Sequence, residues 1–393
     1  MCGIIGYVGR QEAAPILLEG LERMEYRGYD STGMAVCGDG VLRVCKKKGR
    51  VQVLREMSHD GADLPGTLGI GHTRWATHGE PSDVNAHPHL SQSGKFAVVH
   101  NGIIENFIAL KEELLQKGYT FRSETDTEVV AQLLDYYYSD CGDFFEAMNR
   151  LLHAVDGAYA LGIICADYPN ALIAARKDSP LIIGCGENEN FIASDVTAVI
   201  SHTRDVIYME DGEIAVLTAE GVNLFNDEMD PIDKPHSHID WDVSAAEKGG
   251  YPHFMLKEIN EQPAAIMATV SPRVEEGLPV LRIPELTDEV LRGIGRVHLV
   301  GCGTAMHAGM VGKSAIETLA RVPAEVDIAS EFRYRDPILE KNDLVIIISQ
   351  SGETSDTLAA LKLAKSRGVP VLAIVNVVGS SIARAADYVM YTY

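Results

Sequence analysis

The sequence has no paired cysteines, no surplus of positive charge and no long apolar run. Its seven cysteines are scattered singly without a Cys-x-x-Cys pair, which argues against a disulfide framework or structural zinc site and favours a reducing compartment. Lys and Arg total 34 against 56 Asp and Glu, so the net charge is −22 and we expect neither nucleic acid nor an anionic membrane as partner. No apolar run reaches the roughly 18 residues that span a bilayer, and the first residues lack a signal-peptide pattern. We therefore expect a soluble, cytoplasmic protein.

Two clusters of basic side chains could suggest binding sites. The run Lys46-Lys47-Lys48, followed by Arg50, is short enough to be a solvated turn, and we expect no docking there. Several histidines gather between residues 72 and 100, but they form no helical His-x-x-x-His pair and have no carboxylate at ligand spacing. We therefore expect neither a metal ion nor another cofactor.

Apolar periodicity divides the chain into two parts joined by a polar segment. Residues 2–222 alternate short strand-like and helix-like pieces, which is typical of a layered α+β domain. Residues 223–289 include a polar, proline-bearing stretch and are expected to be a linker and joining segment. Residues 290–393 repeat strand, turn and helix, which predicts βαβ units with a parallel sheet. The last predicted strand has no closing helix, so we expect this second domain to be incomplete.

The predicted elements follow from the spacing of apolar residues. In the first part, strands are predicted over 4–8, 68–73, 96–100, 159–165, 171–175 and 181–183, and helices over 12–26, 105–117 and 125–138. In the second part, strands are predicted over 297–300, 344–348, 369–375 and 388–391, and helices over 305–320, 355–367 and 381–386.

Cys2 is the strongest candidate for chemistry, because it directly precedes a predicted buried strand at the start of the chain. If Met1 is removed, the thiol and the α-amine of residue 2 lie close together. An α-amino group titrates near about 7.7–8.0, so it can take the thiol proton without a histidine. Gly3 and Gly6 would let a substrate approach the strand. The alternative is that Cys2 is a small core residue.

Other polar groups follow predicted strands or open a helix. Asn101 and Gly102 can present an amide side chain and a backbone N–H to one point, as an oxyanion hole requires. Arg74 offers a planar fork that matches a carboxylate, and Asp126 can pair with an ammonium group. Each also has a structural interpretation, as a turn, a surface cation and a helix-dipole partner respectively.

Taken together, six blocks within residues 2–220 resemble class II glutamine amidotransferase domains, whose N-terminal-nucleophile fold has four αββα layers. The resemblance implies that Cys2 attacks the side-chain amide of glutamine with its own α-amine as base, while Asn101 and Gly102 hold the oxyanion. Ammonia would leave from a γ-glutamyl thioester, which water then hydrolyses to glutamate. The blocks are Cys2–Gly6, Tyr26–Ser31, Gly71–Gly79, Asn85–His89, His100–Gly102 and Glu124–Glu128.

The same resemblance assigns residues that bind glutamine and release ammonia. Arg74 would grip the α-carboxylate of glutamine, and Asp126 would bind its α-ammonium group. Thr77 and His78 would line the pocket. Trp75 would mark the exit of ammonia, with Arg27 nearby.

In the second part, two turns rich in small polar groups follow predicted parallel strands. These are Gly301–Thr304 and Ser349–Thr354. A dinucleotide fingerprint would need glycine at Met306, and a P-loop would need glycine at His307. Exposed N–H and hydroxyl groups at strand ends and helix N-termini favour an anion site, although serine and threonine can also simply cap the next helix. We expect these turns to bind a phosphate.

The turn 349–354 resembles the phosphosugar signature of sugar isomerase (SIS) domains, which are α/β domains with a parallel sheet. Residues 248–259 resemble a segment that joins an amidotransferase domain to an SIS domain, an order typical of one amidotransferase family of amino sugar synthesis. The resemblance implies that ammonia from the first domain aminates fructose 6-phosphate and that isomerisation gives glucosamine 6-phosphate. The residues it assigns to the sugar phosphate are Thr304, Ser349, Gln350, Ser351 and Thr354.

Two departures from the family pattern bear on activity. Family members usually have serine where this chain has Ala305, which alters one sugar contact. The family also continues into a second SIS subdomain and a tail that carry groups for ring opening and proton transfer. We therefore expect the chain of residues 1–393 to hydrolyse glutamine without making the amino sugar, and the full-length protein to be a homodimer.

Two other functions remain open from the sequence. One is a Cys2 amidotransferase of purine or asparagine synthesis, which should carry a phosphoribosyl or adenylating motif in place of the turn 349–354. The other is an SIS-type sugar-phosphate sensor with a vestigial amidotransferase domain. Intact Cys2, Arg74, Asn101 and Asp126 argue against such decay.

Overall fold

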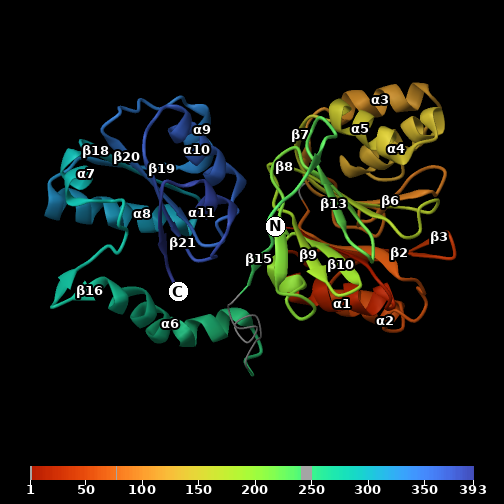
Figure 1. Ribbon diagram of the computed structural model, residues 1–393, viewed down its shortest axis with the longest axis horizontal. Helices are drawn as coiled ribbons and strands as arrows, with labels where there is room; N and C mark the ends of the chain where they lie inside the picture. The colour runs from red at the N-terminus through yellow and green to blue at the C-terminus, as the bar shows by residue number, and fades with distance from the viewer. Residues whose placement is uncertain (1, 77, 240–249) are drawn as a thin grey trace. The chain divides into compact units, whose positions relative to one another are not determined.

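The structure, a computed structural model, describes residues 2–76, 78–239 and 250–393 (Figure 1). Its contacts divide the chain into two units, Met1–Glu247 and Lys248–Tyr393. In the described residues, no helix is both long and apolar enough to cross a membrane.

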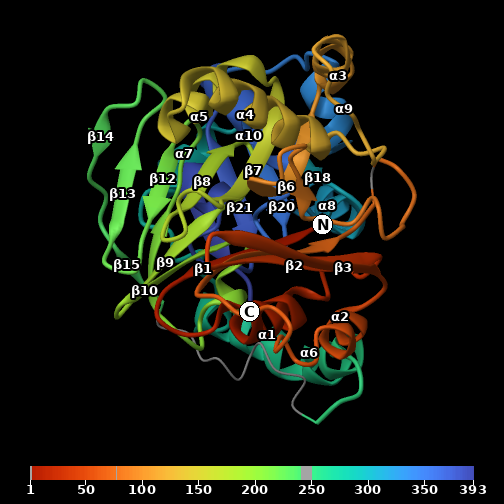
Figure 2. The ribbon, with the colours of Figure 1, turned by 90° about the vertical axis from the view of Figure 1, so that its right-hand side faces the viewer.

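The first unit consists of two antiparallel sheets packed face to face between helical layers (Figure 2). The order of the first sheet is β15 (Ser237–His238), β11 (Asp205–Tyr208), β9 (Ile182–Gly186), β10 (Glu189–Ala193), β1 (Gly3–Val8), β4 (Leu68–Arg74), β2 (Ser31–Gly38) and β3 (Val41–Lys48). The order of the second is β14 (Pro231–Ile232), β13 (Val222–Phe225), β12 (Ile214–Leu217), β8 (Leu172–Lys177), β7 (Gly157–Cys165), β6 (Phe96–Ile104) and β5 (His89–Leu90).

Helices cover the outer face of each sheet, so the unit has four layers. On the first sheet lie α1 (Ala13–Met24) and α2 (Val51–Met57). On the second sheet lie α3 (Phe107–Gln116), α4 (Thr127–Cys141) and α5 (Phe144–Ala154). This arrangement confirms the predicted αββα fold class.

Burial on both faces explains the sequence of β1. Ile4 packs into the core between the two sheets, whereas Ile5 packs against the α1 layer. Every residue of β1 is buried, so the strand reads as a continuous apolar and glycine run without polar alternation. β1 is paired on both sides, with β4 and with β10, and these pairings fix the position of its first residues.

The second unit contains a five-stranded parallel sheet with helices on both faces, which confirms the predicted α/β class. The strand order is β19 (Ala324–Ile328), β18 (Arg296–Gly301), β20 (Asp343–Ser349), β21 (Val371–Val375) and β22 (Tyr388–Tyr391). The helices are α7 (Asp288–Gly293), α8 (Thr304–Ala315) continued by a π-helical turn (Ile316–Ala320), α9 (Ala329–Tyr334), α10 (Ser355–Ser366) and α11 (Ser381–Ala385).

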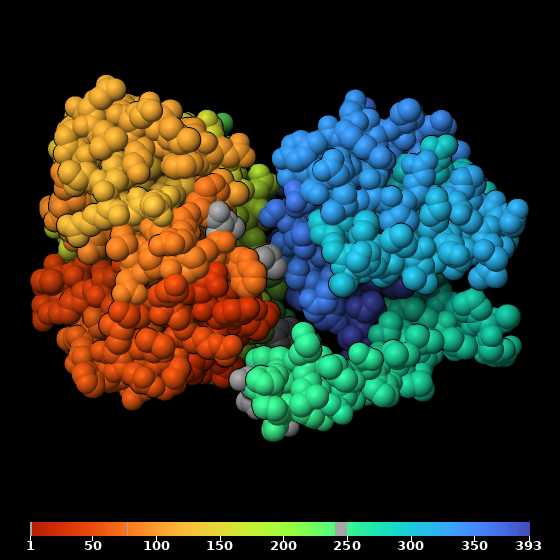
Figure 3. Space-filling model, turned by 180° about the vertical axis from the view of Figure 1, so that it is seen from behind, coloured from red at the N-terminus to blue at the C-terminus, as the bar shows by residue number. Residues whose placement is uncertain are grey.

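The joining segment contributes a long helix to the second unit. α6 (Phe254–Val270) forms a ridge on the outside of this unit (Figure 3). It is followed by a 3₁₀ turn (Ser271–Arg273) and a small hairpin of β16 (Val274–Glu275) and β17 (Leu278–Pro279). Tyr393 N donates a 2.8 Å hydrogen bond to Thr269 Oγ1, which ties the end of α6 to the chain after β22.

Several expectations differ from the structure. The basic run Lys46–Lys48 lies in strand β3 rather than in a turn, because it pairs with Ser31–Gly33 of β2. Lys46 Nζ donates to the carbonyls of Ala86, Pro88 and Val84 at 2.7, 3.1 and 3.2 Å. Residues 223–239, expected to be linker, add β13, β14 and β15 to the sheets of the first unit. Residues 240–249 of the joining segment lie outside the described residues.

Candidate active site

The predicted nucleophile lies where the two sheets of the first unit meet. Cys2 directly precedes β1 of the first sheet, and Asn101 lies on β6 of the second sheet. Asn101 Nδ2 donates a 3.2 Å hydrogen bond to the Cys2 carbonyl oxygen. The fold therefore brings together two residues that are 99 positions apart in the sequence.

The thiol of Cys2 is held against the chain that follows β4. Trp75 N donates to Cys2 Sγ at 3.2 Å, and the thiol reaches the Trp75 carbonyl oxygen at 3.4 Å. Burial raises the pKa of Cys2, and the Trp75 N–H together with the nearby Arg74 and Arg27 opposes this rise only in part. The side chain of Cys2 is therefore a protonated thiol at neutral pH, and a nucleophilic role would require a base.

Asn101 and Gly102 lie inside β6, not in a turn after it, because β6 continues to Ile104 in register with β7. Gly102 has a φ of +128°. A Cβ at this position would overlap the carbonyl oxygen of Ala158 on β7. Glycine is therefore required here both for the backbone angle and for the close approach of the two strands.

Arg74 ends β4 and is 4% exposed. Its Nη2 donates to the carbonyl oxygens of His78 and Gly79, the latter at 3.1 Å, and its Nη1 reaches that of Glu80 at 3.5 Å. The guanidinium thus holds the loop of residues 78–80. A guanidinium has five N–H donors, so these contacts leave part of the fork for a ligand.

Asp126 directly precedes α4 and is also buried. Its Oδ2 accepts a 2.8 Å hydrogen bond from Ile104 N at the end of β6. The same oxygen lies 3.9 Å from His100 Nδ1. The carboxylate is therefore anchored to the strand that carries Asn101.

The remaining predicted residues lie around this centre. The Trp75 ring is 45% exposed and packs edge-on against Tyr29, with ring centroids 5.6 Å apart. The His78 ring packs edge-on against Phe107 at 5.9 Å. Thr77 lies outside the described residues.

Arg27 is fixed by groups that the sequence did not single out. Its Nη1 donates to Asp195 Oδ2 at 2.8 Å and to the Ser194 carbonyl at 3.0 Å. Tyr26 donates to the same Asp195 oxygen at 2.8 Å, and Ser194 Oγ accepts from Ile4 N at 2.9 Å. No pattern around residues 194–195 pointed to this role.

Asp30 was also missed as an individual residue, although it lies in the quoted block Tyr26–Ser31. Asp30 Oδ2 accepts a 2.8 Å hydrogen bond from Ala76 N, directly after Trp75. At Gly28, a Cβ would lie 2.8 Å from the Arg74 carbonyl carbon. The block therefore packs against the backbone that holds the thiol.

In the second unit, the two polar turns lie at the carboxyl ends of neighbouring strands. Gly301 of β18 pairs with Ile348 of β20, so the turns begin at the same level of the sheet. Thr304 opens α8, and it is exposed. Thr354 occupies the N-cap position of α10, without a side-chain hydrogen bond to the helix. The N-termini of both helices thus lie at one edge of the sheet, as an anion site requires.

The side chains of the second turn organise its own backbone. Ser349 Oγ accepts from Gly352 N at 3.1 Å and lies 3.5 Å from Thr354 Oγ1. Ser351 Oγ accepts from Glu353 N at 3.2 Å. Gln350 is exposed, and its Nε2 donates to Asn376 Oδ1 at 3.3 Å. These contacts shape the turn itself, and none of them caps an N–H group of α10.

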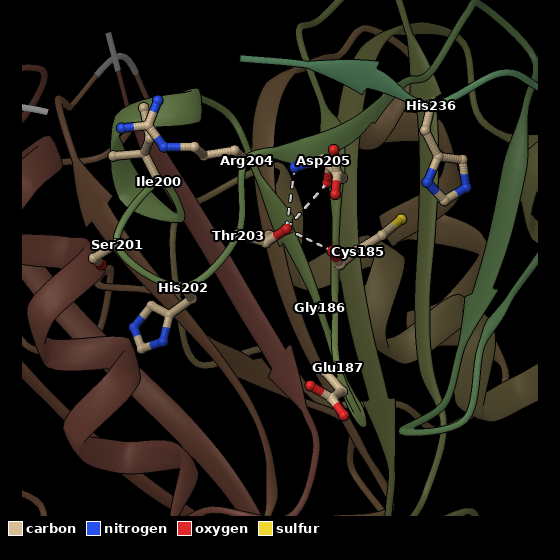
Figure 4. Close-up of a pocket in the computed structure, with 10 residues that line it drawn as sticks. All are labelled: Cys185, Gly186, Glu187, Ile200, Ser201, His202, Thr203, Arg204, Asp205 and His236. Atoms are coloured by element: carbon tan, nitrogen blue, oxygen red, sulfur yellow. Dashed lines mark hydrogen bonds between the residues drawn. The ribbon is translucent and has the colours of Figure 1, made fainter. Parts of the chain in front are cut away.

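A polar pocket of about 690 Å³ lies elsewhere in the first unit (Figure 4). Its lining includes Thr203 just before β11, Asp205 at the start of β11 and Cys185 on β9, with His236 across from the Cys185 thiol. None of the residues drawn there belongs to the predicted site. Among the described residues, no group of three or more His, Cys, Asp or Glu side chains could hold a metal ion.

Comparison with known proteins finds a match in each of the two units. Residues 72–201 match a glutamine amidotransferase domain, and residues 290–393 match an SIS domain. The whole chain is 55% identical to glutamine–fructose-6-phosphate aminotransferase (isomerizing) of Clostridium acetobutylicum, and 56% identical to that of Caldanaerobacter subterraneus subsp. tengcongensis. This chain is a homologue of the glutamine–fructose-6-phosphate aminotransferases. It spans 64% of the length of these two relatives.

The homology to these aminotransferases supports the enzyme interpretation over the sugar-phosphate sensor. Solved structures agree on the fold. The glutamine phosphoribosylpyrophosphate amidotransferase of B. subtilis matches 100% of this chain and 91% of its own, with a TM-score of 0.52 at 19% identity. An allosteric regulatory enzyme of purine biosynthesis gives a TM-score of 0.53 at 21% identity. At these identities the likeness concerns the fold alone, so it does not favour the purine alternative.

Proposed function

We propose that this chain supplies the glutamine-hydrolysing site and the sugar-phosphate turns of a glutamine–fructose-6-phosphate aminotransferase. The observation that carries the proposal is the convergence of Cys2, Trp75 N and the Asn101 amide at one point. The reaction would transfer the amide nitrogen of glutamine to fructose 6-phosphate and give glucosamine 6-phosphate and glutamate.

In the first step, the α-amine of residue 2, freed by removal of Met1, takes the proton of the Cys2 thiol. The thiolate attacks the side-chain carbonyl carbon of glutamine, and the negative charge moves to the carbonyl oxygen. Asn101 Nδ2 and Gly102 N–H stabilise this oxyanion. The intermediate collapses to a thioester, and the α-ammonium group returns its proton to the leaving ammonia. Water then hydrolyses the thioester to glutamate.

The same proposal assigns the ends of the glutamine molecule. The remaining N–H groups of Arg74 bind the α-carboxylate, since a buried guanidinium fork is matched to a planar anion. Asp126 binds the α-ammonium group, and Thr77 and His78 line the pocket. Trp75 and Arg27 border the path by which ammonia leaves.

In the second unit, Thr304, Ser349, Gln350, Ser351 and Thr354 are proposed to hold the phosphate of fructose 6-phosphate. The support is the placement of two helix N-termini at one edge of the parallel sheet. We also propose that the enzyme is cytoplasmic, which the scattered, unpaired cysteines favour. The full-length protein is proposed to be a homodimer, as the family resemblance implies.

The glutaminase proposal is tested by the release of glutamate from glutamine. Cys2→Ala should abolish glutamate release, because no other group on the site can form the thioester. An uncleaved N-terminal extension should also reduce it by orders of magnitude, because it blocks the amine that acts as base. Full activity of the extended protein would contradict the α-amine mechanism, and activity of Cys2→Ala would contradict the assignment of the nucleophile.

A further inference from the structure

Directly beside the proposed oxyanion site lies a cluster of four buried imidazole rings. They belong to His72, His87, His89 and His100, and each side chain is at most 5% exposed. The rings of His72 and His87 are stacked with centroids 4.2 Å apart, and those of His87 and His89 meet edge to face at 4.8 Å. Buried polar rings of this kind normally hold specific hydrogen-bond partners.

Burial keeps these imidazoles neutral at physiological pH. It lowers the pKa of His72 to about 3, that of His87 and His89 well below the usual value, and that of His100 in the same direction. A neutral imidazole has one N–H donor and one acceptor nitrogen. The hydrogen-bond partners therefore decide which nitrogen of each ring carries the proton.

For His72 the partners require the proton on Nε2. This nitrogen lies 3.1 Å from the His100 carbonyl oxygen and 3.0 Å from Asn101 Oδ1. A carbonyl oxygen can only accept, so Nε2 must be the donor. His72 Nδ1 is buried and has no hydrogen-bond partner among the described residues. An N–H group at that position would give up its hydrogen bond to water on folding and would gain no partner in return.

The orientation of the Asn101 amide follows from both of its ends. At one end the Cys2 carbonyl requires a donor, which must be Nδ2 at 3.2 Å. At the other end His72 Nε2 requires an acceptor, which is Oδ1. A rotated amide would face its NH₂ group toward the His72 N–H and its oxygen toward the Cys2 carbonyl. Both contacts would then be lost.

We propose that His72 is a positioning residue that holds the Asn101 amide with its NH₂ group toward the reacting carbonyl of glutamine. The inference rests on the proposed glutaminase function. His72 lies on β4 of the first sheet and Asn101 on β6 of the second. Through this contact, a residue of the first sheet orients an oxyanion donor on the second sheet. His87 stacks on the His72 ring and supports it.

The first test is substitution of the donor. His72→Phe keeps a ring to stack on His87 but removes the Nε2 donor. We expect kcat for glutamine hydrolysis to fall by about 10- to 100-fold. This is a smaller loss than the roughly 10²–10³-fold loss caused by removing an oxyanion donor outright. The KM for glutamine should change by less than about threefold. His72→Gln, which retains an N–H donor, should recover part of kcat.

A double-mutant cycle distinguishes positioning from general stabilisation. If His72 acts through Asn101, His72→Phe should cause no further loss of kcat in an Asn101→Ala background. Equal losses in both backgrounds would overturn the inference. As a matched control, His89→Phe alters an equally buried ring whose Nε2 contacts Thr125 Oγ1 at 3.0 Å, and it should leave kcat within about threefold. Thermal unfolding checks that each variant is folded, and His72→Gln replaces His72→Phe in the cycle if the latter does not fold.

A structural readout separates this inference from the proposed function. In a crystal structure of His72→Phe, or of His72→Gln if needed, the Asn101 amide should rotate or occupy two orientations. An amide that keeps Nδ2 on the Cys2 carbonyl in both variants would overturn the positioning role, whatever the activity. Absence of glutaminase activity in the unaltered chain, with the amide rotated in the variants, would instead contradict the proposed function alone.

Discussion

The Cys2 thiol lies in surroundings that disfavour its own ionisation. Desolvation raises its pKa, while the cations of Arg74 and Arg27 are near enough to oppose the shift only in part. Both cations have competing partners, in the loop carbonyls and in Asp195 respectively. The proposed role of Cys2 as nucleophile therefore depends on a base, and in the proposed mechanism that base is its own amine.

This dependence predicts the pH profile of glutamine hydrolysis. The amine must be unprotonated to accept the thiol proton, so kcat/KM should rise with pH through an apparent pKa of about 7.7–8.0. If direct ionisation of the thiol controlled the rate, the inflection would lie above the ordinary thiol value of 9.0, because burial raises the pKa of Cys2. Measurement of kcat/KM from pH 6 to 10 decides between the two, and a flat profile would contradict both.

Individual roles differ in how far the sequence could predict them. Cys2, Arg74 and Asn101 stand in motifs whose chemistry is readable, and the structure brings them together at the sheet junction. Asp195 and His72 could not be assigned in the same way. Their roles depend on which strand of one sheet faces which strand of the other, and local spacing does not encode that packing.

At the level of elements, the parallel strands and their following helices were predictable because apolar runs alternate with amphipathic segments. β19 was missed, since Glu325 and Asp327 interrupt its apolar pattern. The pair β2 and β3 was missed because β3 carries the lysine run, which is typical of exposed chain. Here the pairing with a buried neighbour decides the structure, and propensity does not.

The turn after β20 gives a prediction at this scale. Gly352 has a φ of +65°, and a Cβ there would overlap Ser380 Oγ. Gly352→Ala should therefore distort the turn and weaken fructose 6-phosphate binding, measured by calorimetric titration, by about 10-fold or more. Adding Ser380→Gly removes the overlap but leaves alanine at position 352 in a left-handed backbone conformation, which costs about 1–2 kcal/mol.

The double variant Gly352→Ala with Ser380→Gly should therefore recover binding only in part. Full recovery would show that the backbone angle is not limiting. Unchanged binding in Gly352→Ala alone would contradict the placement of the phosphate at this turn. Ser380→Gly alone is the matched control, and we expect it to bind as the unaltered chain does.

On the scale of the whole first unit, the buried imidazoles predict acid sensitivity. Their folded-state pKa values lie below the ordinary 6.5, so the unfolded chain binds more protons than the folded chain below that pH. Stability is therefore complete above about pH 6.5 and is lost as pH falls toward the folded values. Each ring contributes at most about 1.4 kcal/mol per pH unit in that window.

Urea unfolding of the first unit should thus show a clearly lower midpoint at pH 5 than at pH 7. His89→Phe should make this pH dependence shallower, because it removes one neutral ring from the set. Equal midpoints at the two pH values would contradict the assignment of neutral, buried histidines.

The division of the proposed site between two sheets has a consequence for distant mutations. Cys2 and Asn101 belong to opposite layers, and the apolar core between those layers sets their spacing. A methyl group deleted at Val99 or Ile70 would let one sheet slide slightly on the other without unfolding either. Temperature-sensitive alleles with normal protein levels but poor glutamine use should therefore cluster in this inner core.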